Sequence, residues 1–139
     1  VTYWEQAKAR LLGVDPAVIE RYNVVSGPVA AQMARGARTA SGASLSVSVT
    51  GLAGPGGGDE VRPVGTVYIA GSAGDGVWVE KFHFVRSDRE NIRARAAHAA
   101  LELALRLAQG KAPAGCYRLD AAACDDPAAL AALNGALIL

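Results

Sequence analysis

Two strand-like runs joined by a very short link set the strongest limit on the fold. GTVYIAG (65–71) and GVWVEKFHFV (76–85) are connected only by SAGDG. A link this short cannot hold the crossover that parallel strands require, so the two runs are expected to form an antiparallel hairpin. The apolar positions of the second run change phase between Val79 and Phe82, which predicts a bulge near Glu80 and Lys81.

The remaining segments add one strand and several helices. LSVSVTG (45–51) alternates apolar residues with small serines, which predicts a strand that can be covered on both faces. Helical spacing of apolar residues holds over 88–109, and shorter helices are expected to end at Gly13, to begin at Asp15, and to run from Ser26 to Gly42. Strands separated by long helices indicate an α/β protein, a three-layer α/β/α domain with a mixed sheet.

Composition excludes several classes of protein. The 139 residues suit one domain, and a formal charge of +1 leaves no electrostatic footprint for nucleic acid or an anionic membrane. No apolar run approaches the ~20 residues that span a bilayer, and no secretory signal opens the chain, so a cytoplasmic location is expected. Cys116 and Cys124 have no companion at metal-ligand spacing, which predicts two free thiols and no metal site.

The segment 110–139 differs in character from the rest. It is rich in alanine and offers one short helix, capped by Asp126 and Pro127 and expected to stop at Asn134-Gly135. We see no catalytic grouping in it.

The glycine-rich stretch GLAGPGGG (51–58) leaves one predicted strand and precedes the next. It is neither a P-loop, since no Gly-Lys-Ser/Thr follows, nor a dinucleotide fingerprint, since a strand follows it. On pattern alone, a loop that contacts a ligand through backbone N–H groups and Thr50 and a tight structural crossover are equally good interpretations. Asp59, Glu60 and Arg62 are expected to be solvated loop residues.

Several segments together resemble the CinA C-terminal domain family. VTGLAGPGGG and RPVGTVYIA resemble its T-G-I-A-G-P-G-G-G and K-P-V-G-T-V-Y, and VTYWEQAKARLLGV resembles V-T-Y-S-N-x-A-K-x-x-x-L-G-V. YNVVSGPVAAQMARGAR and SDRENIRARAAHAAL also match family segments in the family's order. Gly27 replaces an acidic family residue, and Ser87 replaces a glycine. The resemblance covers 1–109 and leaves 110–139 as an extension.

The resemblance implies an amidohydrolase that converts nicotinamide mononucleotide to nicotinic acid mononucleotide and ammonia, with no metal or cofactor. The family's tyrosine falls on Tyr3, and its base lysine falls on Lys8. Without the resemblance, Lys8 would be an ordinary solvated lysine on the polar face of a helix. The residues expected to contact the small-molecule nucleotide are Thr50, Gly51, Gly54, Gly56, Gly57 and Arg89.

The family's serine nucleophile lies in an A-E-S-C-T-G-G segment, and nothing like that segment occurs in this chain. Ser26 is explained as a helix cap, and Ser46 and Ser48 as small strand residues. Three explanations remain: the sequence is short at its N-terminus, the protein is a decayed member kept for nucleotide binding or assembly, or the tail rebuilds the lost part with GALIL as a strand. An incomplete sheet would expose an edge, so self-association into a homo-oligomer is expected.

Overall fold

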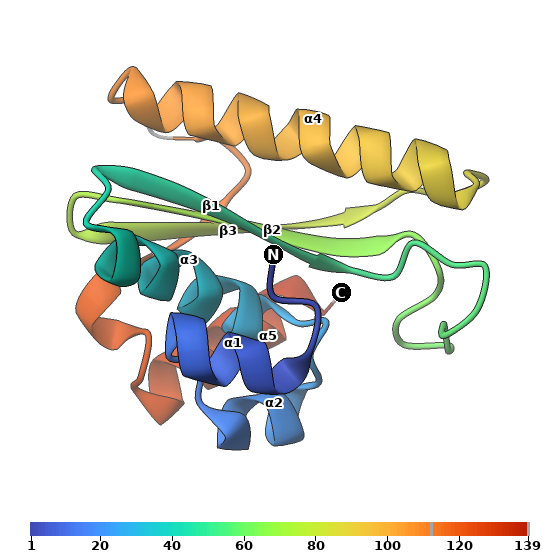
Figure 1. The fold of residues 1–139 in the computed structure, drawn as a ribbon, viewed down its shortest axis with the longest axis horizontal. Coiled ribbons are helices and arrows are strands. Elements are labelled where there is room, and N and C mark those ends of the chain that lie inside the picture. Colours follow the sequence, from blue (N-terminus) through green and yellow to red (C-terminus); the bar gives the residue numbers. More distant parts are fainter. Residues whose placement is uncertain (112, 139) are drawn as a thin grey trace.

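One sheet with helices on both of its faces forms the three layers of the molecule (Figure 1). The computed structural model describes residues 1–111 and 113–138. The strands are β1 (Leu45–Gly51), β2 (Thr66–Ala73), β3 (Gly76–His83) and β4 (Tyr117–Asp120). The helices are α1 (Glu5–Leu12), α2 (Pro16–Tyr22), α3 (Gly27–Ser41), α4 (Arg89–Ala108) and α5 (Pro127–Leu137), with a 3-10 turn η1 (Ala121–Ala123) before α5. Helix α4 covers one face and the other helices cover the opposite face (Figure 1), which confirms the α/β class.

The strands lie in the order β1-β2-β3-β4, and every described pair is antiparallel. The hairpin of β2 and β3 is confirmed. The expectation of a mixed sheet is wrong, because β4 starts opposite the middle of β3, with Tyr117 beside Val79, and runs back to place Asp120 beside Gly76. The chain therefore returns along the sheet after α4 before the last strand begins.

The bulge expected in β3 is absent from the described strands. The register between β2 and β3 is continuous from the pair Thr66 and His83 to the pair Ala73 and Gly76. The apolar pattern changes phase there because two successive polar residues, Glu80 and Lys81, follow each other in a regular strand and have different neighbours. Glu80 lies within 3.6 Å of the Cys116 sulfur, whereas the Lys81 ammonium lies 5.9 Å from the centre of the Tyr68 ring.

Strand β1 packs differently on its two faces, as its alternation predicts. Leu45 and Val47 pack against the core below α4. The hydroxyl groups on the opposite face donate hydrogen bonds to backbone carbonyls, from Ser48 to Ala30 of α3 at 2.7 Å and from Thr50 to Val24 at 2.8 Å. Small hydroxyl side chains let α3 lie close to the strand, their own buried donors find acceptors, and the Val24 carbonyl outside the helices gains a partner.

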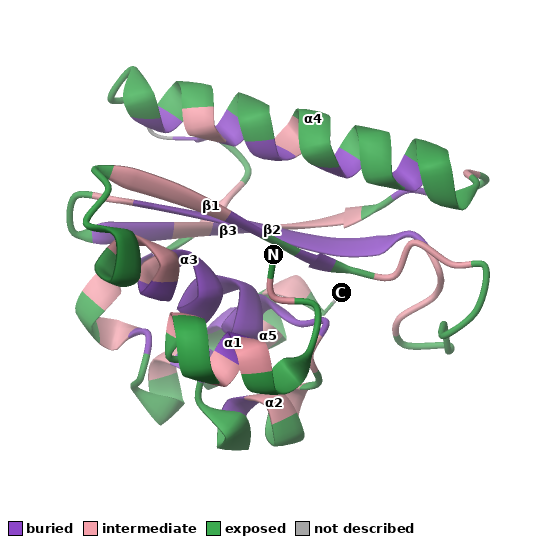
Figure 2. Cartoon of the chain, in the orientation of Figure 1, coloured by how far each residue is buried: buried purple, intermediate pink, exposed green. Residues whose placement is uncertain are grey.

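The helices before residue 110 begin and end within a residue or two of the positions that the sequence predicts. The Asp15 carboxylate accepts from the N–H of Ala17, and the Ser26 hydroxyl accepts from the N–H of Val29. The long helix α4 buries its apolar stripe, which Figure 2 shows facing the sheet. Its buried residues are Ile92, Ala96, Ala100, Leu103 and Leu107.

The C-terminal segment belongs to the same core as the rest of the chain. Leu119, Leu130 and Leu133 are buried among core residues of α3 and the sheet. The Gln32 side chain, itself buried, donates to the carbonyl of Cys124 at 2.9 Å. Strand β4 was not predicted.

Helix α5 also continues beyond the stop expected at Asn134-Gly135, as far as Leu137. The idea that GALIL forms a strand is therefore wrong for residues 135–138, and Leu139 lies outside the described residues. The Cβ position of Gly27 lies 3.1 Å from a methyl carbon of Leu137, so a larger residue at the start of α3 would press against α5.

None of the helices in the described part of the chain combines the length and the apolar character that crossing a bilayer requires.

Candidate functional site

A groove of about 800 Å³ runs beside β1, at the open edge of the sheet. Its walls are the start of the chain with α1, residues 23–26 between α2 and α3 (the connector), helix α3, and β1 itself. The lining residues from these elements include Thr2, Tyr3, Lys8, Val24, Val25, Met33, Ser48 and Thr50. The groove therefore combines the Lys8 ammonium and the Glu5 carboxylate with largely apolar walls.

Lys8 is buried in this groove, with only 7% of its surface exposed. Helix α1 lies close against α3 because Gly36 has no side chain, and a Cβ there would overlap the carbonyl of Leu12. The Lys8 ammonium donates to the carbonyl oxygen of Thr2. The interpretation of Lys8 as a solvated surface lysine is thus wrong.

Burial changes the chemistry of Lys8. Desolvation lowers the pKa of its ammonium from the ordinary value, and the carboxylate of Glu5 acts in the opposite direction. A lysine that gives up its proton more readily can serve as a general base, which a fully solvated lysine does poorly near neutral pH.

Tyr3 lines the same groove but is 83% exposed. The structure thus brings Tyr3 and Lys8 to one groove.

The glycine loop (residues 52–65) joins β1 to β2 and projects beyond the sheet (Figure 1). Gly54 and Gly57 adopt φ values of +77° and +92°, which side chains other than glycine rarely tolerate. Within the described residues, the backbone N–H groups of Gly54, Gly56 and Gly57 donate to no protein acceptor. These groups are available to an anionic or carbonyl-bearing ligand.

The expected nucleotide-binding residues fall into two sets. Thr50 and Gly51 line the groove. The Thr50 hydroxyl already donates to Val24, so it holds the connector in place. Gly54, Gly56, Gly57 and Arg89 lie on or beside the glycine loop, outside the groove lining.

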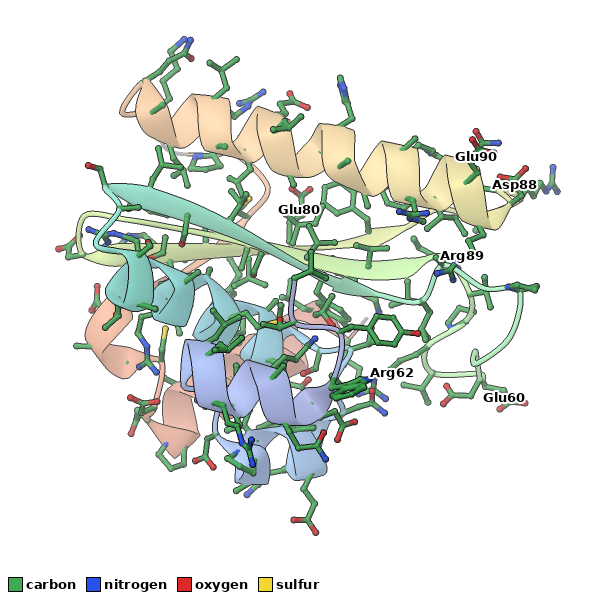
Figure 3. All side chains as sticks on the ribbon, viewed as in Figure 1. Glu60, Arg62, Glu80, Asp88, Arg89 and Glu90 are labelled. Atoms are coloured by element: carbon green, nitrogen blue, oxygen red, sulfur yellow. The ribbon has the colours of Figure 1, made fainter. Side chains whose placement is uncertain are left out.

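Two arginines hold the glycine loop, and sequence reasoning missed one of them. Arg89, at the start of α4, donates to the carbonyl of Gly54 at 3.0 Å. Arg62 is not a freely solvated loop residue: it donates to the carbonyls of Val25 and Tyr22. Figure 3 shows Arg89 on the α4 side of the loop and Arg62 on the side of α1 and α2, with Glu60 at the far tip. The only sequence feature that could have pointed to Arg62 is the match of RPVG (62–65) to the family's K-P-V-G.

Ser48 is the serine that lines the groove among the described residues, and its hydroxyl donates to Ala30. The two cysteines are free thiols, as predicted. Burial is the main cause that raises the pKa of Cys116 to about 12 and that of Cys124 to about 11. Neither cysteine lines the groove that contains Lys8, so neither stands where a nucleophile would meet that base.

Fold and groove together define an α/β protein with a desolvated lysine beside an open sheet edge and a glycine-rich loop at the end of the edge strand. The model of the CinA C-terminal domain family matches residues 1–108. The chain belongs to this family.

Relatives and solved structures agree with this assignment. A CinA-like protein of Chlorobaculum tepidum is 56% identical over 105 residues, which cover 73% of this chain and 25% of that protein. One from Mycobacterium marinum is 48% identical over 103 residues, 74% of this chain and 24% of that protein. The chain thus spans about a quarter of the length of these relatives.

Two crystal structures share the fold. A competence/damage inducible protein of Agrobacterium tumefaciens has a TM-score of 0.74 and 39% identity, covering 77% of this chain and 66% of that one. A competence-damaged protein (CinA) superfamily member of Escherichia coli has a TM-score of 0.72 and 39% identity, covering 77% and 62%.

Proposed function

We propose that this chain forms the base-bearing part of an amidohydrolase that converts nicotinamide mononucleotide to nicotinic acid mononucleotide and ammonia. The observation that carries the proposal is the burial of Lys8 in a groove at the open edge of the sheet. In this proposal, the serine that attacks the amide comes from a segment outside these 139 residues, seated in the groove beside β1. The two free thiols fit a cytoplasmic enzyme.

The chemistry is acyl transfer. Neutral Lys8 accepts the serine proton as the serine oxygen bonds to the amide carbon, and the proton then passes to the amide nitrogen as the C–N bond breaks and ammonia leaves. Water hydrolyses the resulting ester to the carboxylate and restores the serine. In this proposal, Tyr3, which lines the same groove, donates a hydrogen bond to the reacting groups.

The glycine loop and Arg89 would hold the rest of the nucleotide. Free N–H groups at Gly54, Gly56 and Gly57 are donors for ribose or phosphate oxygens. Arg89 uses one nitrogen for Gly54 and keeps further donors for a phosphate.

A chimera tests the proposal. The region of the Chlorobaculum tepidum relative that precedes the matched residues would be fused to this chain, and ammonia release from nicotinamide mononucleotide would be measured. We expect release that disappears in Lys8→Ala and persists in Lys111→Ala, which alters an exposed lysine three residues beyond α4. A folded chimera that binds the nucleotide but releases no ammonia would refute the amidohydrolase proposal.

A second candidate is a catalytically inactive nucleotide-binding or assembly domain. The observation in its favour is that Ser48, the serine that lines the groove, already donates its hydroxyl hydrogen bond to the carbonyl of Ala30. Under this candidate, the open β1 edge and the exposed rings of Tyr3 and Trp4 drive formation of a homo-oligomer. Sedimentation of the chain over a range of concentrations checks it: a monomer throughout would count against an assembly role.

A further inference from the structure

The connector is an irregular segment, and side chains donate to most of its carbonyl groups. Four successive carbonyl groups, from Tyr22 to Val25, each accept a side-chain hydrogen bond. Ser26 donates to Asn23 at 2.8 Å, and Thr50 donates to Val24 at 2.8 Å. The connector forms part of the groove wall, so these donors fix that wall.

Arg62 supplies the two remaining donors and comes from the glycine loop. Its Nε donates to Val25 at 2.7 Å and its Nη2 donates to Tyr22 at 2.5 Å. Among the described residues, no carboxylate pairs with this guanidinium. The planar fork of arginine therefore reaches two backbone acceptors with two separate nitrogens, a geometry that the single nitrogen of a lysine does not reproduce.

The loop presents Arg62 through a tight local turn. The Asp59 carboxylate accepts from the N–H groups of Val61 and Arg62, and the Asp59 N–H donates to the carbonyl of Arg62. The two limbs of the loop are also close, since a Cβ on Gly58 would lie 2.6 Å from the nitrogen of Val64. A rigid turn thus links Arg62 to the glycines that carry free N–H groups.

We propose that Arg62 is a positioning residue that fixes the glycine loop against the groove wall, so that the loop and Lys8 can contact the same substrate molecule. This inference rests on the proposed function for its substrate, nicotinamide mononucleotide. Arg62 touches no reacting atom: it acts through the connector on one side and the glycines on the other.

Nuclear magnetic resonance of the whole chain tests this role. Backbone ¹⁵N relaxation reports the mobility of Gly54, Gly56 and Gly57. In Arg62→Ala we expect their order parameters to fall from the rigid range, about 0.85, to below about 0.6. Arg62→Lys should lie between the two, and Arg93→Ala, which alters an exposed arginine on α4, should match the unaltered chain.

A nucleotide titration separates this inference from the proposed function. Shifts of the same glycine signals with nicotinamide mononucleotide give the dissociation constant, which we expect to rise about tenfold in Arg62→Ala. The positioning role is overturned if the glycines stay rigid in Arg62→Ala, or if they loosen while nucleotide affinity is unchanged. If the unaltered chain does not bind the nucleotide, the same titration is made on the chimera. If the chimera does not bind it either, the proposed function fails, and the order parameters alone decide whether Arg62 holds the loop.

Discussion

Replacing Leu133 with alanine tests whether the C-terminal segment is part of the core. Leu133 is 0% exposed, and its Cγ lies 3.5 Å from the Cβ position of Gly27 in α3. The change removes buried methyl groups and leaves a cavity that surrounding helices cannot readily fill. Such substitutions at fully buried leucines cost 2–5 kcal/mol, so we expect Leu133→Ala to lower the free energy of unfolding by about 3 kcal/mol.

Urea denaturation followed by circular dichroism measures this loss. For 139 residues, it corresponds to a fall of about 10 °C in the melting temperature. The control is Leu101→Ala on the outer face of α4, where the leucine is 69% exposed and the expected change is within about 0.5 kcal/mol. Equal losses in the two variants would refute the view that α5 completes the core.

Three further predictions use the same unfolding measurement. Gly36→Ala should destabilise the protein strongly because a Cβ there overlaps the backbone of α1, whereas Gly135→Ala, with open space around it in α5, should stabilise it by about 0.5–1 kcal/mol. Burial lowers the pKa of Lys8 in the folded state, so between that pKa and 10.5 the unfolded chain binds more protons than the folded one. The unaltered protein therefore becomes more stable as the pH rises through this window. Lys8→Met should stabilise the protein at neutral pH, and this gain should shrink over the same window. Hydrogen bonding to Arg35 lowers the pKa of Asp125, so its contribution should be lost as the pH falls through the folded pKa, and Asp125→Asn should flatten the acid limb of the stability profile.

Local sequence rules predicted the elements that depend on local chemistry. Asp15 and Ser26 cap helices where expected, and the β2-β3 link forces a hairpin whatever surrounds it. Strand β4 escaped prediction because its four residues, YRLD, become a strand only by pairing with β3. The mixed sheet was wrong for a related reason: strand direction depends on where the chain returns after α4, which no local pattern records.

The candidate site was predicted in part. The resemblance identified Lys8, but its position on the polar side of α1 predicted exposure to solvent. Its burial depends on how α1 packs in the fold, close against α3 at Gly36 and beside the groove, which the local pattern does not record. Arg62 was read as solvated because its partners, the carbonyls of Tyr22 and Val25, lie far away in sequence. Backbone acceptors carry no side-chain pattern, so sequence reasoning could not identify this pair.

The two edges of the sheet differ in how far the rest of the chain covers them, and this difference bears on function. At one edge, the C-terminal segment supplies β4 to pair with β3 from Gly76 to Val79, and α5 covers the adjacent face. At the other edge, β1 has no strand partner within the described residues, and the groove beside it contains Lys8. Open edges are liabilities that folded proteins usually cover. The tail thus covers the edge remote from Lys8 and leaves free the edge where the proposed function seats the serine-bearing segment.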